Sequence, residues 1–124
     1  MIIIKKYETK IKKLYTFFEF VPCNSWEDFE VFRFIFKERL GYEIENEFEA
    51  IYARSCIFKK NDFTFELFFH DDYGNCIANP KKQSKEYYKK LEELANEIAE
   101  GVATNRFELQ GMSWSEIQKE TSSQ

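Results

Sequence analysis

Apolar and polar residues alternate with two different periods along the chain, and the change of period separates strands from helices. A period of two is typical of a strand with one buried face, whereas steps of three and four are typical of an amphipathic helix. Residues 14–21, LYTFFEFV, are rich in aromatic and β-branched side chains and end at Pro22. This composition predicts a strand. Residues 2–7 are either a first short strand or a frayed end.

Residues 25–41 have helix signals at both ends. Ser25 and Asp28 have the spacing of a near capping box, and Gly41 follows the last apolar position as a residue that ends helices. The apolar residues step by three and four and so form one stripe, which comprises Trp26, Phe29, Phe32, Ile35, Phe36 and Leu40.

A second helix is predicted after the last strand. Ser84 is its expected N-cap and Gly101 its expected end. Its buried stripe consists of Tyr87, Leu91, Leu94, Ala95 and Ile98.

Between the two helices the period stays near two. Residues 42–58 are predicted to form one long strand, or two strands separated by a bend near Glu49 and Ala50. Residues 63–70 form a strand in which Phe63, Phe65, Leu67 and Phe69 alternate with Thr64, Glu66, Phe68 and His70. The sequence DDYGN is a turn signal that precedes a short returning strand.

This order of elements, β-α-β-β(-β)-α, predicts an α+β fold in which an antiparallel sheet of about four to five strands carries two main helices on one face. An arrangement with one helix on each side of the sheet is the alternative. We expect residues 1–101 to form the domain and residues 102–124 to form a polar C-terminal tail. A capping box at Ser113 and Glu116 makes a short extra helix in that tail an alternative to a loosely held segment.

Composition narrows the class of protein. The chain has 124 residues, enough for one core, with 44% hydrophobic and 32% charged residues. Its net charge of −4 disfavours nucleic acid as a partner and favours a basic one. The odd number of widely spaced cysteines indicates reduced thiols and therefore a cytoplasmic protein. No apolar run is long enough to cross a membrane, so we expect no membrane partner.

The sequence contains no motif that defines a reaction. The lone histidine, His70, precedes two aspartates but has no second imidazole or cysteine ligand nearby, which argues against a metal site. We therefore expect no catalytic residue, no metal and no cofactor. The alternative is a small enzyme or ligand-binding module with a pocket between sheet and helices, and with Cys23, His70 or Asp72 at its mouth.

Residues 42–50, YEIENEFEA, place glutamate at every second position. In a regular strand these side chains project from one face about 7 Å apart, while Ile44 and Phe48 face the core. Such a row is either a solvated or edge-protecting face or a docking surface for a cationic partner. The row consists of Glu43, Glu45, Glu47 and Glu49.

The chain is small and acidic, has an acidic strand, and contains many aromatic residues, with fourteen Phe and seven Tyr. In these respects it is similar in class to bacterial toxin-immunity proteins, including those of contact-dependent growth inhibition systems. The resemblance implies an antitoxin that binds a basic toxin domain through acidic and aromatic groups. The residues that we expect to bind this partner are Glu43, Glu45, Glu47, Glu49, Asp71, Asp72 and Tyr73. A protein that forms a homodimer through an aromatic sheet face is a further alternative.

Overall fold

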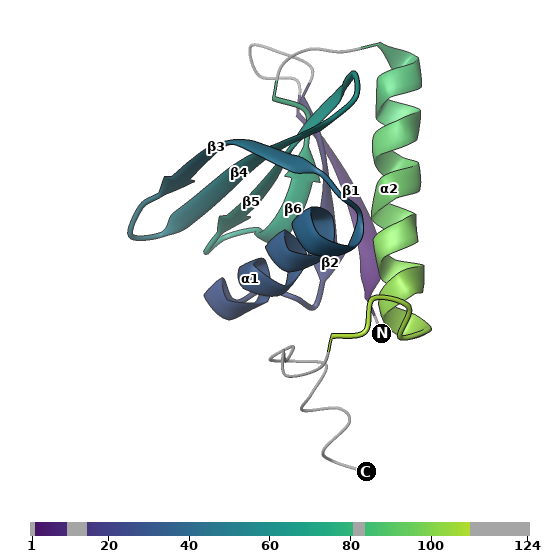
Figure 1. Ribbon diagram of the computed structural model, residues 1–124. Coiled ribbons are helices and arrows are strands. Elements are labelled where there is room, and N and C mark those ends of the chain that lie inside the picture. The colour runs from purple at the N-terminus through teal and green to yellow at the C-terminus, as the bar shows by residue number, and fades with distance from the viewer. Residues whose placement is uncertain (1, 10–14, 81–83, 110–124) are drawn as a thin grey trace.

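The computed structural model describes residues 2–9, 15–80 and 84–109, and this part of the chain contains six strands and two helices (Figure 1). The strands are β1 (Ile3–Thr9), β2 (Tyr15–Val21), β3 (Glu43–Glu49), β4 (Ala53–Lys60), β5 (Phe63–His70) and β6 (Gly74–Ala78). The helices are α1 (Trp26–Phe34), which continues into a π-helical turn, η1 (Ile35–Arg39), and α2 (Lys85–Ala103).

All strands of the described sheet are antiparallel, in the order β1-β2-β6-β5-β4-β3. The α+β class is therefore confirmed. The expected count of four to five strands is too low, because residues 3–9 form a complete edge strand and residues 42–58 divide into β3 and β4. The predicted bend lies at residues 50–52, where the backbone N–H of Ala50 donates to Ala53 O at 2.8 Å.

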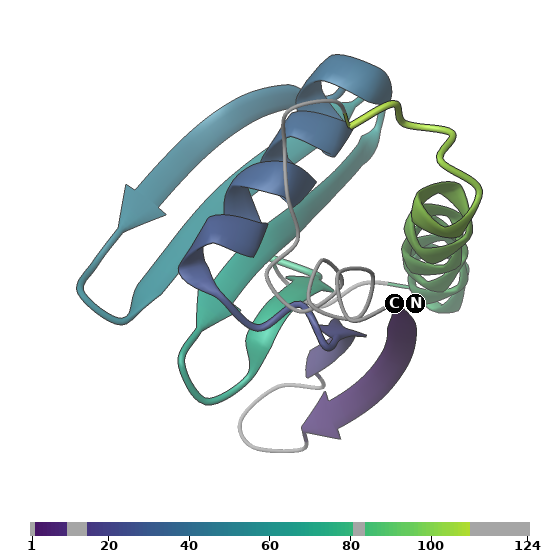
Figure 2. The same ribbon diagram turned by 90° about the horizontal axis from the view of Figure 1, so that it is seen from below.

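Both helices cover the same face of the sheet, so the alternative with one helix on each side is wrong. Helix α2 lies against β1, β2 and β6, whereas α1 lies against β5 (Figure 2). Buried residues of both helices belong to one core cluster with the inward residues of the strands. The alternation predicted for β5 is confirmed, since Phe63, Phe65, Leu67 and Phe69 are all buried.

The start of α1 follows the predicted capping box. Ser25 Oγ accepts from the backbone N–H of Asp28 at 3.1 Å, and the Asp28 carboxylate accepts from the N–H of Ser25 at 3.4 Å. The helix then widens, because the N–H of Leu40 donates to Ile35 O five residues earlier. Gly41 follows with φ of 74°, the left-handed conformation expected of a residue that ends a helix.

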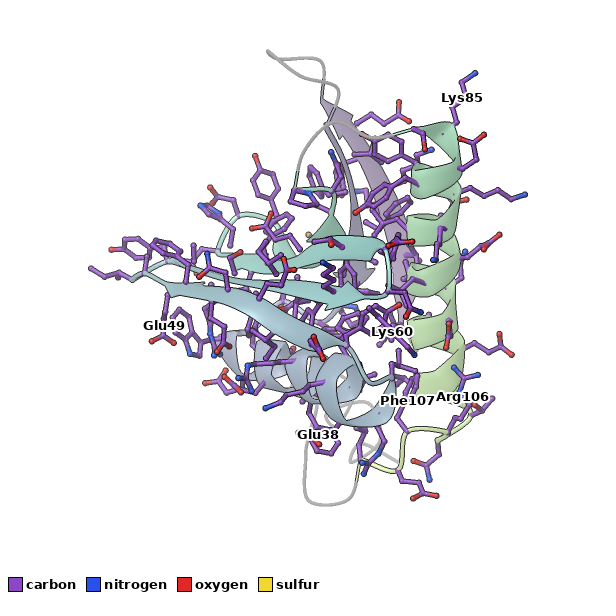
Figure 3. The ribbon with its side chains drawn as sticks, turned by 45° about the horizontal axis from the view of Figure 1, so that its top comes forward. Glu38, Glu49, Lys60, Lys85, Arg106 and Phe107 are labelled. Carbon is purple, nitrogen blue, oxygen red and sulfur yellow. The ribbon has the colours of Figure 1, made fainter. Side chains whose placement is uncertain are left out.

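The end of α2 differs from the prediction. Ser84 caps the helix as expected, but the helix passes through Gly101 and ends at Ala103. Gly101 is buried, and its missing side chain makes room for the ring of Phe107, which is itself buried (Figure 3). Val102, Phe107 and Leu109 therefore pack on the core, and the capping box at Ser113 and Glu116 lies outside the described residues.

None of the helices in the described ranges is long and apolar enough to cross a membrane.

Candidate protein-binding face

A β-bulge divides the row of glutamates on β3. Ile44 pairs with Phe58 and Asn46 pairs with Ile57, so Glu45 is an extra residue with no partner of its own in β4. Beyond the bulge Glu47 lies opposite the buried Cys56. The expectation that the four glutamates share one face is therefore wrong, because one inserted residue exchanges the two faces of the strand.

Three of the four glutamates of β3 are also paired with basic groups. Glu47 Oε1 lies 2.6 Å from Nε of Arg33 in α1, and this hydrogen bond lowers the pKa of the Glu47 carboxyl. Glu45 lies 3.6 Å from Lys59, and Glu49 lies 3.5 Å from Arg54. The row is thus not a line of uncompensated negative charge.

Arg54 is held on the helix side of the sheet. Its guanidinium carbon lies 4.3 Å from the ring centre of Phe29 and 4.9 Å from that of Trp26. Its carboxylate partners are Glu30 and Glu49. The contacts of this guanidinium are therefore with aromatic and acidic groups of its own chain.

Phe48 lies on the uncovered face of the sheet, contrary to the prediction that it is buried. It pairs with Ser55 of β4, and its side chain is 61% exposed. Two further large apolar residues at the tip of the β3–β4 hairpin, Ile51 and Tyr52, are 83% and 64% exposed. The hairpin tip therefore presents an apolar surface to solvent.

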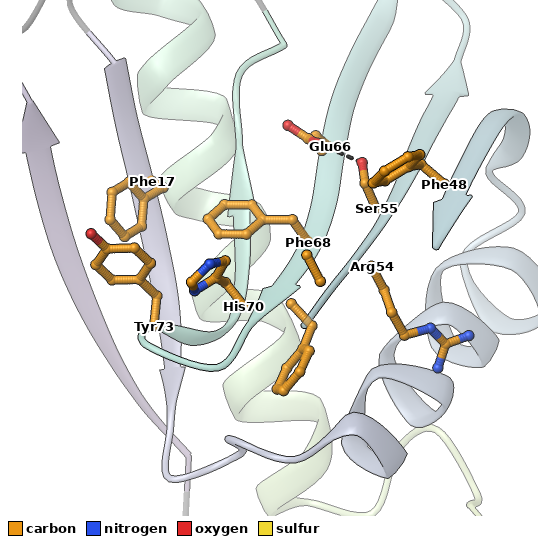
Figure 4. Close-up of a pocket in the computed structure, with 10 residues that line it drawn as sticks. Phe17, Phe48, Arg54, Ser55, Glu66, Phe68, His70 and Tyr73 are labelled. Carbon is orange, nitrogen blue, oxygen red and sulfur yellow. Dashed lines mark hydrogen bonds between the residues drawn. The ribbon is translucent and has the colours of Figure 1, made fainter. Parts of the chain in front are cut away.

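A groove of about 440 Å³ begins beside this tip and crosses the uncovered face (Figure 4). Its lining comes from β2, β3, β4, β5 and the turn before β6, and consists of Phe17, Phe48, Ala53, Arg54, Ser55, Glu66, Phe68, Phe69, His70 and Tyr73. Tyr73 packs edge-on against Phe17 with ring centres 5.7 Å apart. The groove is therefore largely aromatic.

Glu66 is the acidic group inside the groove. Its carboxylate accepts a hydrogen bond from Ser55 Oγ on the neighbouring strand (Figure 4). Within the described residues Glu66 forms no ion pair, in contrast to Glu45, Glu47 and Glu49. A half-buried carboxylate without a cation beside it is a charged acceptor for a ligand.

The remaining predicted site residues lie next to the groove. The N–H of Asp71 donates to Tyr52 O at 3.3 Å, which joins the β5–β6 turn to the hairpin tip. The N–H of Asp72 donates to His70 Nδ1 at 3.0 Å. Asp71, Asp72 and Tyr73 are exposed, so two of the predicted carboxylates flank the groove and one predicted aromatic ring lines it.

The cysteines have the properties of core residues. Cys23, Cys56 and Cys76 are buried, and burial raises the pKa of each thiol, that of Cys56 to about 12. Cys23 does not line the groove. In the described residues no group of three or more His, Cys, Asp or Glu side chains is placed to hold a metal ion.

Comparisons of the chain with protein-family models, with curated proteins and with solved structures gave no match.

The groove itself was not predicted from the sequence. Phe68 was assigned to the same strand face as Thr64, Glu66 and His70, and a large aromatic residue on an otherwise polar face is the signal that could have revealed it. Phe48 gave no such signal, because its orientation depends on the bulge at Glu45.

Proposed function

We propose that this protein is a non-catalytic binding module that acts as an immunity protein, and that it neutralises a basic bacterial toxin domain in the cytoplasm by covering part of its surface. The observation that carries the proposal is the uncovered sheet face, where an aromatic groove continues into the exposed hairpin tip. Both helices lie on the opposite face, so nothing in the described chain covers this surface.

The chemistry of the face supports a protein partner. Aromatic side chains that are exposed before binding and buried afterwards contribute much of the affinity of protein interfaces. Phe48, Tyr52 and Tyr73 are such residues, with exposed fractions of 61%, 64% and 49%. Because Phe48 and Tyr73 line the groove and Tyr52 lies at the hairpin tip beside it, a protruding segment of the partner can bury all three together with the groove walls.

The charges of the face support a basic partner. Glu66 lies in the groove, and Asp71 and Asp72 lie in the exposed turn beside it. Arg54 is among the lining residues, but its guanidinium lies on the helix side of the sheet, where it is paired with Glu30 and Glu49. With a net charge of −4, the protein would attract a cationic partner at long range and align it at short range.

The test uses the product of the reading frame next to the gene of this protein, which the proposal expects to be a basic toxin domain. Co-expression is expected to restore growth, and surface plasmon resonance is expected to show a complex whose association rate constant falls as salt rises. The double variant Phe48→Ala/Tyr52→Ala should raise the dissociation constant of the complex at least about tenfold, because both rings are exposed in the free protein and would be buried by the partner. The matched control is Glu93→Ala/Asn96→Ala on the exposed side of α2. Absence of a complex, or equal binding by both double variants, would overturn the proposal.

A small-molecule ligand in the same groove is the second candidate function. The volume of about 440 Å³ is within the usual range for ligand sites, and His70 forms part of the wall. The two functions differ in their response to His70→Gln and to loss of the hairpin tip. A ligand-binding module depends on His70 and tolerates Ile51→Ala and Tyr52→Ala, because neither Ile51 nor Tyr52 lines the groove.

A further inference from the structure

We propose that the part of the groove between Phe48 and Phe68 is a slot for one arginine side chain of the partner, with Glu66 as the carboxylate that pairs with its guanidinium. This inference rests on the proposed function and specifies which chemical group the face recognises. Three residues that lie side by side across the sheet form the slot, namely Phe48 of β3, Ser55 of β4 and Phe68 of β5.

The register of the strands sets the width of the slot. Phe48 pairs with Ser55, and Ser55 pairs with Phe68, so the two phenylalanine residues are two strands apart with a small residue between them. Adjacent strands are about 4.8 Å apart, which separates the two phenylalanine backbones by about 9.6 Å. A planar group stacked between two rings needs about 7 to 8 Å between the ring planes. The backbone spacing therefore leaves room for one planar group above Ser55 and beside the Phe48 ring, while the Phe68 ring lies edge-on against Phe17 with ring centres 5.7 Å apart.

The position of Glu66 adds charge to this shape. Glu66 lies two residues before Phe68 on β5, and its side chain reaches back to Ser55 at the base of the slot (Figure 4). The Ser55 hydroxyl donates to one carboxylate oxygen, Oε2, and fixes the orientation of the group. No described cation pairs with it, so a bound guanidinium would supply the missing positive charge.

Arginine fits this combination better than lysine. A guanidinium is planar, stacks on aromatic faces, donates to a carboxylate through two N–H groups and is more weakly hydrated than an ammonium. A mostly aromatic recess with one carboxylate at its end favours each of these properties. The protein uses the same chemistry internally, because Arg54 lies over Phe29 and Trp26 while it pairs with Glu30.

The slot is tested with the peptide acetyl-Gly-Arg-Gly-amide, titrated into the protein and followed by the backbone amide shifts of Ser55 and Phe68. The expected result is a saturable shift at these two residues. The same peptide with citrulline in place of arginine keeps the planar shape without the charge and should bind at least about tenfold more weakly. The lysine peptide should bind several-fold more weakly. Absence of saturation, or equal binding of the arginine and citrulline peptides, would overturn the inference.

Variants then assign the contacts. Glu66→Gln keeps an oxygen that can accept from Ser55 Oγ but removes the negative charge. This variant should bind the arginine peptide with an affinity about tenfold lower. Ser55→Leu fills the base of the slot and should abolish binding while Phe48 and Phe68 stay in place. Glu93→Gln makes the same charge change on exposed α2 and should have no effect. If Glu93→Gln weakens binding of the arginine peptide as much as Glu66→Gln does, the peptide is attracted by the overall negative charge of the protein, and the slot is wrong.

The outcomes for the slot and for the proposed function are separable. If the toxin domain forms a complex that Phe48→Ala/Tyr52→Ala weakens and Glu66→Gln leaves unchanged, the binding face stands and the arginine slot is wrong. If the arginine peptide saturates the slot and no toxin domain binds, the slot stands and the proposed function is wrong.

Discussion

Individual buried polar residues hold the irregular parts of this protein in place, and Asn75 is the clearest case. Its side-chain Nδ2 donates to Cys23 O at 2.9 Å and to Ser25 O at 3.0 Å. These two bonds fasten the segment between β2 and α1 to the start of β6. The side-chain oxygen, Oδ1, has no hydrogen-bond partner and is buried. Asn75 therefore acts as a hydrogen-bond donor at this position, and its contribution to the stability of the fold depends on its side-chain N–H groups.

Asn75→Asp should destabilise the protein strongly, and the loss should depend on pH. The substitution places a carboxylate against two carbonyl oxygens in a buried site, which costs at least about 3 kcal/mol when the group is charged. Burial and the carbonyl oxygens raise the folded-state pKa of the introduced carboxyl above its unfolded value near 3.9. Below about pH 3 the group is protonated in both states, so the ionisation cost is absent there. Stability should then fall as pH rises.

Urea unfolding of wild type and variant between pH 4 and pH 7 measures this effect. Asn96→Asp, on the exposed side of α2, is the control and should give a nearly constant difference from wild type over the same range. A pH-independent loss for Asn75→Asp would mean that the side chain acts through its shape and not through its N–H groups.

At the scale of elements, the sequence predicted the parts whose signals are local. The capping box at Ser25 and the alternation of β5 need only neighbouring residues, and both agree with the structure. The orientation of β3 needs the pairing partner as well, because the bulge at Glu45 is defined by where Ile44 and Asn46 meet β4. For this reason the acidic row and the burial of Phe48 were predicted wrongly, and the groove was missed.

Deletion of Glu45 is the test of the bulge. Ile44 already pairs with Phe58 and Asn46 with Ile57, two neighbouring residues of β4, so removing Glu45 leaves regular pairing on both sides. The deletion should therefore cost less than about 1 kcal/mol, since a regular antiparallel pair replaces a bulge. In a strand without a bulge the same deletion would turn Ile44 or Phe48 to the opposite face and cost far more.

Urea unfolding gives the free-energy change, and cross-strand contacts between Phe48 and Ser55 in NMR spectra show whether the register survives. Deletion of Ile57 is the control, because β4 has no extra residue on that stretch and one residue fewer shifts its pairing. Equal destabilisation by the two deletions would contradict the assignment of Glu45 as the inserted residue.

At the scale of the whole molecule, the sheet order joins segments that are far apart in the sequence. Strand β2 pairs with β6, although α1, β3, β4 and β5 lie between them in the sequence, and the last helix covers β1 and β2. Local periodicity gave the elements, and the order of elements predicted both helices on one face, but neither gave these strand pairings or the residues of the uncovered face. The same holds for Phe107, whose burial depends on contact with α2 and with Arg39, since Arg39 Nε donates to Phe107 O at 2.7 Å.

The contact between Gly101 and Phe107 tests whether residues after α2 belong to the folded unit. A Cβ at position 101 would lie 2.2 Å from the Phe107 ring, so Gly101→Ala should destabilise the protein by about 1 to 3 kcal/mol through overpacking. In a variant that already carries Phe107→Ala the ring is gone. There the same change should stabilise the protein by up to about 1 kcal/mol, because alanine is the better helix former. Urea unfolding of the four proteins measures this reversal of sign. If Gly101→Ala has the same effect in both backgrounds, Phe107 does not pack on α2 in solution and the folded unit ends with the helix.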